Sequence, residues 1–189
     1  NYDNQSMKKK LEFIIGDYGK LLDCMIEGAD KLLNISENIY QMGICETTNS
    51  EMNEIKIVDL VNASLDIINY FKKSNISINY IKHEEIELKI FGKQTELELA
   101  IVNILLNALY SCEEKAGAII NIETTDCQRK IVLTITHNGA QIPTENVDNI
   151  FDPFFANQTR NKQFWIGLAV SKRVISEHNG QIDVKQLKE

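Results

Sequence analysis

Two asparagines with helical spacing are the residues of this sequence best suited to chemistry. Asn103 and Asn107 lie four residues apart in the largely apolar run from Glu96 to Glu114, so both side chains point from one face of a helix. An unpaired carboxamide in apolar surroundings costs about 1–3 kcal/mol, so both need partners. A carboxamide oxygen is also a hard ligand suited to Mg²⁺, which in turn bridges nucleotide phosphates. Taken alone, the pair favours the simpler interpretation, two asparagines that bond to a neighbouring loop.

Four further landmarks follow these asparagines in order. A strand runs into T-H-N-G at Thr136–Gly139, and after a short helix comes F-D-P-F-F at Phe151–Phe155. The stretch W-I-G-L begins at Trp165, and H-N-G-Q-I-D-V ends the pattern at Val184. With these five ordered landmarks, residues 57–184 resemble the ATP-binding domain of sensor histidine kinases, which is related to those of gyrase and the heat-shock chaperones.

The resemblance implies a fold, a ligand and a set of contact residues. The implied fold is α+β, a two-layer α/β sandwich in which helices back a mixed sheet. The implied ligand is ATP with Mg²⁺, and Asn107 is the implied metal ligand. No residue is assigned a catalytic role. The implied nucleotide-binding positions belong to the asparagine box and the two glycine boxes: Asn103, Asn107, His137, Gly139, Gly167 and Leu168.

Both glycine boxes depart from the family pattern. The first reads Asp-x-Gly-x-Gly in the family, and its aspartate accepts a hydrogen bond from the adenine amino group. Here His137 and Gln141 replace the aspartate and the second glycine. Losing a charge-assisted bond of about 1.5–3 kcal/mol lowers affinity roughly ten- to a hundredfold. In the second box, Gln163 and Trp165 stand where glycines let backbone amides approach the phosphates. The aromatic pair of Phe164 and Trp165 either fills the cleft or lies on the surface.

These departures favour a dimeric, pseudokinase-like module of two-component signalling with lost or weak ATP binding. Such a module would carry no cofactor and would dock a response-regulator receiver domain or another kinase. The alternatives are an active ATP-dependent histidine kinase that uses Asn107 with Mg²⁺, and a histidine phosphotransfer protein on the kinase fold. No phosphoacceptor is recognisable, because His83 falls between two expected strands and His178 belongs to the closing motif. Whether the chain is an enzyme stays open.

The elements that position these residues begin with a long helix. Apolar residues recur at spacings of three and four from Leu11 to Met42, a heptad-type seam that requires a partner helix. We expect residues 1–45 to form the stem of a homodimer and residues 46–56 to form a polar linker. Residues 57–189 then form the ATPase-like domain, which we expect to be C-terminally truncated, because relatives continue into another strand.

Hydrophobic periodicity predicts alternating helices and strands within that domain. The predicted helices are 58–73, 95–115 and 168–179, the second begun by a capping box of Thr95 and Glu98. The predicted strands are 76–81, 88–91, 118–125, 130–136 and 181–184, with a hairpin turn at 126–129.

Composition excludes several classes of function. A net charge of −7 over 189 residues and a pI near 5.1 argue against nucleic acid or an anionic membrane surface as the main partner. No run approaches the roughly 18 apolar residues of a membrane span. The four cysteines form no CxxC pair, which favours reduced thiols in a cytoplasmic protein over a zinc site. Nine glycines are few, and of six glycine-box signature positions only Gly139 and Gly167 remain.

Overall fold

The computed structural model describes four stretches of the chain and three single residues. The stretches are 51–81, 87–127, 130–152 and 165–186, and the single residues are Tyr18, Met25 and Gly28. The chain divides into two units, Asn1–Gly43 and Ile44–Glu189. Among the described residues, no helix combines the length and the apolar character needed to cross a membrane.

The first unit is described at three positions of the predicted stem. Tyr18, Met25 and Gly28 are all helical, and the side chains of Tyr18 and Met25 are exposed in the isolated chain. The rest of the heptad seam lies outside the described residues. The dimerisation stem therefore remains a prediction.

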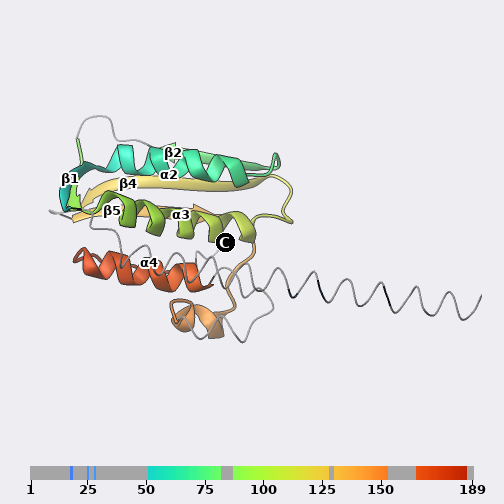
Figure 1. The fold of residues 1–189 in the computed structure, drawn as a ribbon. Helices are drawn as coiled ribbons and strands as arrows, with labels where there is room; N and C mark the ends of the chain where they lie inside the picture. The colour runs from blue at the N-terminus through green and yellow to red at the C-terminus, as the bar shows by residue number, and fades with distance from the viewer. Residues whose placement is uncertain are drawn as a thin grey trace, which may run out of the picture. The chain divides into compact units, whose positions relative to one another are not determined.

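A three-stranded mixed sheet forms one layer of the second unit (Figure 1). Its order is β2 (Ile76–Ile81), β4 (Ala118–Cys127) and β5 (Lys130–His137), with β2 parallel and β5 antiparallel to β4. Buried and exposed residues alternate along the first half of β4, so one face of this strand lies on the core. The antiparallel register places His137, the last residue of β5, opposite Ile120 of β4.

A second, two-stranded sheet pairs β1 (Asn53–Lys56) with β3 (Lys89–Gly92) in antiparallel register. Sequence analysis predicted β3 but missed β1, which falls where a linker was expected. The reason is the composition of β1, N-E-I-K, in which only Ile55 is buried. A strand this short and polar has no recognisable pattern of its own and exists because β3 supplies its hydrogen bonds.

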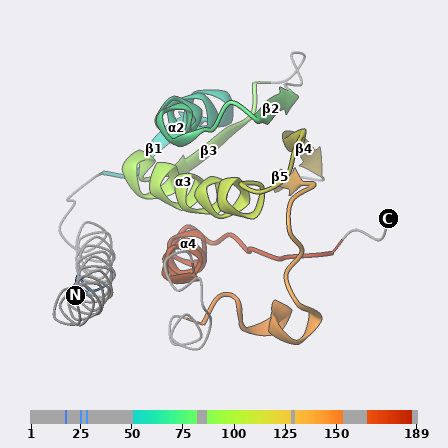
Figure 2. The ribbon, with the colours of Figure 1, turned by 90° about the vertical axis from the view of Figure 1, so that its right-hand side faces the viewer.

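Three helices form the other layer, on one side of the three-stranded sheet (Figure 2). They are α2 (Ile57–Phe71), α3 (Gln94–Ser111) and α4 (Trp165–Glu177), with α3 in the middle. A short 3₁₀ helix, η1 (Thr144–Asn149), follows β5. Because neighbours cover α3 on several sides, its buried residues occur around much of its circumference.

The hydrophobic core lies between the helices and the β2-β4-β5 sheet. Aliphatic side chains of the two layers make up nearly all of it. Its fully buried members, with no more than 2% of their surface exposed, include Leu60, Val61, Ile68, Ile76, Ala100, Leu105, Ile120, Ile122 and Val174. The predicted α+β fold, a mixed sheet backed by helices, is confirmed.

Three local predictions are wrong. The capping box of Thr95 and Glu98 does not form: Lys93 is the N-cap, without a side-chain cap bond, and the carboxylate of Glu98 accepts a hydrogen bond from Gln94 Nε2. Residues 181–184 alternate in exposure but are not a strand, because no described strand pairs with them. The helix predicted to reach residue 115 ends at Ser111.

Candidate functional site

Three polar residues line one face of α3 at the spacing of a helical turn. Asn103, Asn107 and Ser111 are four residues apart, and we call them the polar stripe. At 1.5 Å per residue the stripe is about 12 Å long. The Ser111 hydroxyl donates to the backbone carbonyl of Asn107 over 3.0 Å. The predicted common face of Asn103 and Asn107 follows directly from their helical spacing.

Asn103 is buried and incompletely bonded. Only 5% of its surface is exposed, and its Nδ2 has no hydrogen-bond partner among the described residues. Asn107 is half-buried. A buried carboxamide N–H without a partner is costly, so Asn103 is a donor that an anionic ligand would satisfy. A second stripe residue, Asn107, has the carboxamide oxygen suited to Mg²⁺. The chemistry of this pair fits a magnesium nucleotide.

Gly167 of α4 lies directly against Asn103. A Cβ atom on Gly167 would lie 3.1 Å from Cγ and Oδ1 of Asn103, so the glycine is what lets the two helices approach here. Gly167 is in the first turn of α4, whose amide groups point out of the helix end and favour negative charge. The hydroxyl of Ser171, fully buried, reaches the carbonyls of Gly167 and Ala100 at 2.9 and 3.0 Å and so ties α4 to α3.

Gly139 lies directly against Ser111, at the other end of the stripe. A Cβ atom here would lie 2.3 Å from the carbonyl oxygen and 2.5 Å from the carbonyl carbon of Ser111. The next residue, Ala140, donates its N–H to the same Ser111 oxygen over 2.7 Å. The chain that leaves β5 therefore rests on the C-terminal end of α3, and only glycine fits at position 139.

Asn138 fixes this turn in place. Its side-chain Oδ1 accepts the N–H of Ile119 over 2.8 Å, and its own N–H donates to the Ile119 carbonyl over 3.2 Å. The amide Nδ2 donates to the carbonyl of Gly117, and the Lys115 ammonium donates to the carbonyl of Asn138. These bonds tie the start of the turn after β5 to residues 115–119, the segment that leads from α3 into β4.

His137 precedes this turn and faces the helix layer. Ile131, Leu133 and Ile135 of β5 pack on the core, and His137 continues the same alternating row. Its Nδ1 accepts a hydrogen bond from the Gly139 N–H over 3.2 Å. Burial lowers the pKa of the His137 imidazole below its ordinary value, so the ring is neutral near pH 7.

The bond to Gly139 determines which ring nitrogen carries the proton. Because Nδ1 of His137 accepts, the hydrogen of the neutral ring lies on Nε2. Nε2 has no partner within the part of the chain that the structure describes. A neutral histidine has one accepting nitrogen, and here the turn uses it. The position where the family places an accepting aspartate therefore presents a donor.

The structure describes the remaining predicted site residues only in part. The side chain of Leu168 is buried, 5% exposed, in the first turn of α4, and its role in nucleotide binding stays a prediction. Gln163 and Phe164 lie outside the described residues. Trp165 begins α4, but its side chain lies outside the described part, so both interpretations of the aromatic pair stay open. Sequence analysis missed Ser111, although its spacing from Asn107 repeats that of the asparagines.

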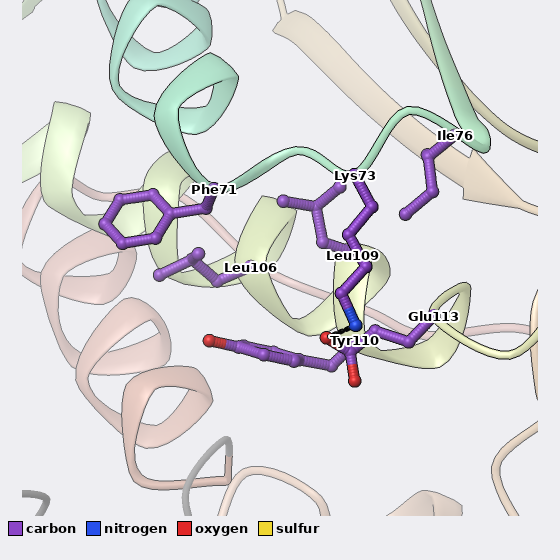
Figure 3. A pocket seen from close by; sticks show the side chains of 7 residues that line it. All are labelled: Phe71, Lys73, Ile76, Leu106, Leu109, Tyr110 and Glu113. Atoms are coloured by element: carbon purple, nitrogen blue, oxygen red, sulfur yellow. Dashed lines mark ion pairs between the residues drawn. The ribbon is translucent and has the colours of Figure 1, made fainter.

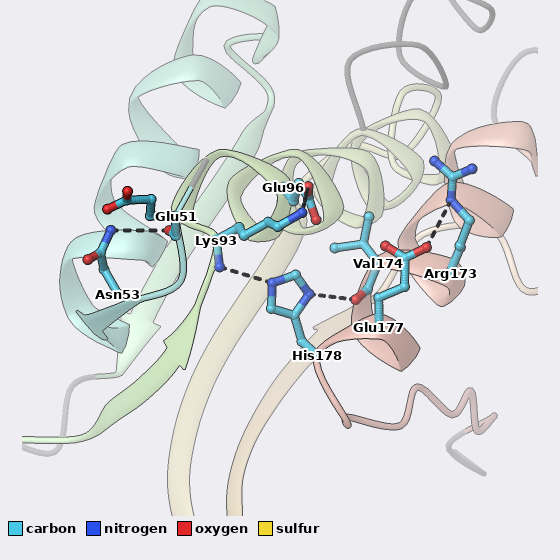
Figure 4. Close-up of polar contacts among 8 residues, drawn as sticks. All are labelled: Glu51, Asn53, Lys93, Glu96, Arg173, Val174, Glu177 and His178. Carbon is cyan, nitrogen blue, oxygen red and sulfur yellow. Dashed lines mark hydrogen bonds and ion pairs between the residues drawn. The ribbon is translucent and has the colours of Figure 1, made fainter. Parts of the chain in front are cut away.

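His178 has a structural role, as predicted. Its Nε2 accepts the N–H of Lys93 over 3.0 Å, and its Nδ1 donates to the carbonyl of Val174 over 2.7 Å (Figure 4). The imidazole thus joins the end of α4 to the start of α3. Beside it, the carboxylate of Glu96, 1% exposed, contacts the Lys93 ammonium over 2.9 Å. No group of three metal-binding side chains occurs among the described residues.

A shallow pocket lies elsewhere, between the ends of α2 and α3 (Figure 3). An ion pair of Lys73 and Glu113, 2.9 Å long, lies at its edge. Its apolar lining comes from Phe71, Ile76, Leu106, Leu109 and Tyr110. It contains none of the stripe residues and is separate from the candidate site.

Comparison with curated proteins places these features among sensor proteins. Sensor histidine kinase ZraS of Salmonella typhi is 22% identical over 173 residues, which are 91% of this chain and 36% of ZraS. The C4-dicarboxylate transport sensor protein DctB of Rhizobium meliloti is 30% identical over 98 residues, 52% of this chain and 16% of DctB. The chain spans about a third or less of the length of these relatives.

Solved structures give the same fold. The nucleotide-free catalytic domain of histidine kinase ThkA matches with a TM-score of 0.59 at 22% identity, over 68% of this chain and 82% of that one. ThkA in complex with the response regulator protein TrrA matches with a TM-score of 0.61 at 20% identity, over 80% of this chain and 43% of that one.

A family model settles the membership. The model of the histidine kinase-, DNA gyrase B- and HSP90-like ATPases matches residues 92–189, just over half of the chain. The match contains the whole polar stripe, both retained glycines and the histidine that joins α4 to α3. This chain belongs to that ATPase family and carries the ATPase core of a sensor histidine kinase.

Proposed function

We propose that this chain is a two-component signalling module in which adenine-nucleotide binding is weak, and that it acts by docking a partner. The partner is a response-regulator receiver domain or another kinase. Residues 1–45 supply the helical stem of a homodimer in this proposal, and residues 57–189 supply the ATPase-like domain.

The observation that carries the proposal is the hydrogen bond from the Gly139 N–H to Nδ1 of His137, 3.2 Å long. It uses the accepting nitrogen of His137, so this position offers adenine no acceptor. Changing the tautomer would put an N–H on Nδ1 against the Gly139 N–H. That change leaves a half-buried donor unpaired, at a cost of about 1–3 kcal/mol.

The retained glycines support the same conclusion. A Cβ atom on Gly139 or Gly167 would collide with or press on α3 itself. Packing therefore requires glycine at position 139 and favours a small residue at position 167, so neither glycine by itself indicates a nucleotide site. Gln163 and Trp165 stand where glycines would serve only the ligand.

Docking is the part of the proposal that draws on relatives. ThkA, which shares the fold, has been solved in complex with the response regulator TrrA. A dimeric stem with an attached ATPase-like domain offers such a regulator a surface whether or not ATP is turned over. Sedimentation of the full chain tests the stem: a monomer at micromolar concentration contradicts it.

Thermal unfolding with and without Mg-ATP tests the nucleotide claim. A ligand at a hundred times its Kd adds about 2.7 kcal/mol of stability. We expect no shift at sub-millimolar Mg-ATP in the native chain. We expect a shift after combining His137→Asp with Gln163→Gly and Trp165→Gly. His83→Asp, the same change at a residue that belongs to none of the family motifs, is the matched control and gains nothing. A clear shift in the native chain at sub-millimolar Mg-ATP contradicts weak binding.

An active histidine kinase is the second candidate, and one observation favours it. Asn103, whose Nδ2 has no hydrogen-bond partner among the described residues, lies against Gly167 in the first turn of α4, and the half-buried Asn107 is one helical turn further along α3. This is the donor set that magnesium and phosphates require. When bound, Mg²⁺ would neutralise phosphate charge, and Asn107 is the residue that would hold it. Incorporation of the γ-phosphate of ATP into this chain, or hydrolysis of ATP by it, distinguishes this candidate from the first.

A further inference from the structure

We propose that the candidate site, at its end nearest His137, prefers purines with a carbonyl group at C6 over adenine. Hypoxanthine and guanine are such purines. The inference rests on the proposed function, because it explains why ATP binds weakly. It names the class of ligand that the remaining site takes, a 6-oxopurine nucleotide.

The two ends of the polar stripe differ in what they attract. At the Asn103 end, the first turn of α4 lies against the stripe through Gly167. The amides of that turn favour negative charge, and so does Nδ2 of Asn103, which has no hydrogen-bond partner in the described part of the chain. The phosphates of a nucleotide therefore lie at this end.

The base then lies at the Ser111 end. The stripe is about 12 Å long, which is comparable to the extent of a nucleotide from its phosphates to its base. At this end the turn after β5 rests on Ser111 through Gly139 and Ala140. His137 leads into that turn from the face of β5 that points to the helices.

At the Ser111 end of the stripe, where the base lies, the backbone N–H groups already donate hydrogen bonds within the protein. The N–H groups of Asn138, Gly139 and Ala140 donate to Ile119, His137 and Ser111 respectively. His137 Nε2–H is left with no partner among the described residues. Burial lowers the pKa of this imidazole, which keeps the ring neutral and the proton on Nε2. Asn138 ties the turn to residues 115–119, and the bond from the Gly139 N–H orients the His137 ring on that turn.

A fixed N–H donor distinguishes the purines by their C6 group. Adenine carries an amino group there, which is also a donor, whereas guanine and hypoxanthine carry the O6 acceptor. Two donors that face each other leave both unpaired, and a donor facing O6 forms a hydrogen bond. The same residue that rejects adenine therefore accepts a 6-oxopurine.

Three triphosphates that differ only in the purine test this inference on the full native chain. They are inosine triphosphate, purine riboside triphosphate, which has hydrogen at C6, and ATP, each with Mg²⁺ and followed by titration calorimetry. We expect affinity to fall in that order, with inosine triphosphate about tenfold tighter than ATP. His137→Asp should reverse the order, and His137→Asn, whose amide both donates and accepts, should bring the two nearly level.

Several outcomes overturn the inference. One is equal affinity for ATP and inosine triphosphate, and another is no binding of inosine triphosphate at any accessible concentration. Purine riboside and ATP both tighter than inosine triphosphate would mean that the donor contacts N1 instead. Tight ATP binding with the expected order contradicts only the proposed function, whereas weak ATP without the order contradicts only this inference.

A measurement on the unliganded native chain avoids reliance on a folded variant. Long-range ¹H–¹⁵N spectra of the histidine rings report the tautomer directly. We expect His137 to carry its proton on Nε2, and assignment by comparison with His137→Asn identifies its signals. A proton on Nδ1 overturns the inference.

Discussion

Replacing Gly139 by alanine tests whether the retained glycine serves packing. A Cβ atom at this position would lie 2.3 Å from the Ser111 oxygen and 2.9 Å from the Cys112 nitrogen. Ordinary van der Waals contacts begin near 3.4 Å, so the turn must move by about 1 Å from α3. Both obstacles are backbone atoms, which cannot rotate aside.

The expected cost follows from two terms. Overpacking of this kind costs about 1–3 kcal/mol, and the 2.7 Å bond from Ala140 to Ser111 contributes about 0.5–1.5 kcal/mol. We therefore expect Gly139→Ala to lower the free energy of unfolding by about 2–4 kcal/mol. With a urea m-value of about 2 kcal/mol/M, the unfolding midpoint falls by about 1–2 M.

Equilibrium urea unfolding followed by far-UV circular dichroism measures this change without nucleotide present. Ala140→Gly, a change of the same size at the next residue, is the matched control and should cost less than about 1 kcal/mol. Adding Ser111→Ala to Gly139→Ala should give no rescue, because the clash is with the main chain. A cost of Gly139→Ala below about 0.5 kcal/mol refutes the packing argument.

Two further predictions concern the histidines. His178→Ala removes the acceptor, 3.0 Å away, of the Lys93 N–H, and it should lower the free energy of unfolding in urea by about 1–3 kcal/mol. The control Glu177→Ala breaks only an exposed ion pair and should lower it by less than about 0.5 kcal/mol. Equal costs would contradict a structural role for His178. Burial lowers the pKa of His137, so below about pH 6.5 the unfolded chain binds more protons than the folded one. The free energy of unfolding should therefore decline as pH falls from 7.5 to 5.5, and less steeply in His137→Asn; parallel slopes would contradict the buried, neutral ring.

The predicted bounds of helices and strands agree with the structure where the hydrophobic residues recur at a regular spacing. The strand 76–81 was predicted with its observed ends, and α2 within one residue at its start and two at its end. The failures occurred where a partner decides the structure. β1 needs β3 to supply its bonds, and residues 181–184 have a strand's alternation but no described strand beside them.

The candidate site was predicted in outline and not in its contacts. The spacing of Asn103 and Asn107 determines their common helix face in any fold. Nothing local indicates that Gly139 rests on Ser111, because the two are 28 residues apart and meet only through the packing of β5 against α3. The sense of the His137 hydrogen bond depends on that same turn.

The sequence by itself determined the family, the order of the helices and of the four longer or regular strands, and the departures from both glycine boxes, because motif residues and hydrophobic periods are properties of the chain. Only the tertiary structure decided why Gly139 and Gly167 remain. At Gly139 the turn after β5 approaches the main chain of α3 too closely for a Cβ atom, and at Gly167 α4 lies tightly against the Asn103 side chain. The tertiary structure also decided that His137 presents a donor, because hydrogen-bond direction depends on which groups folding brings together.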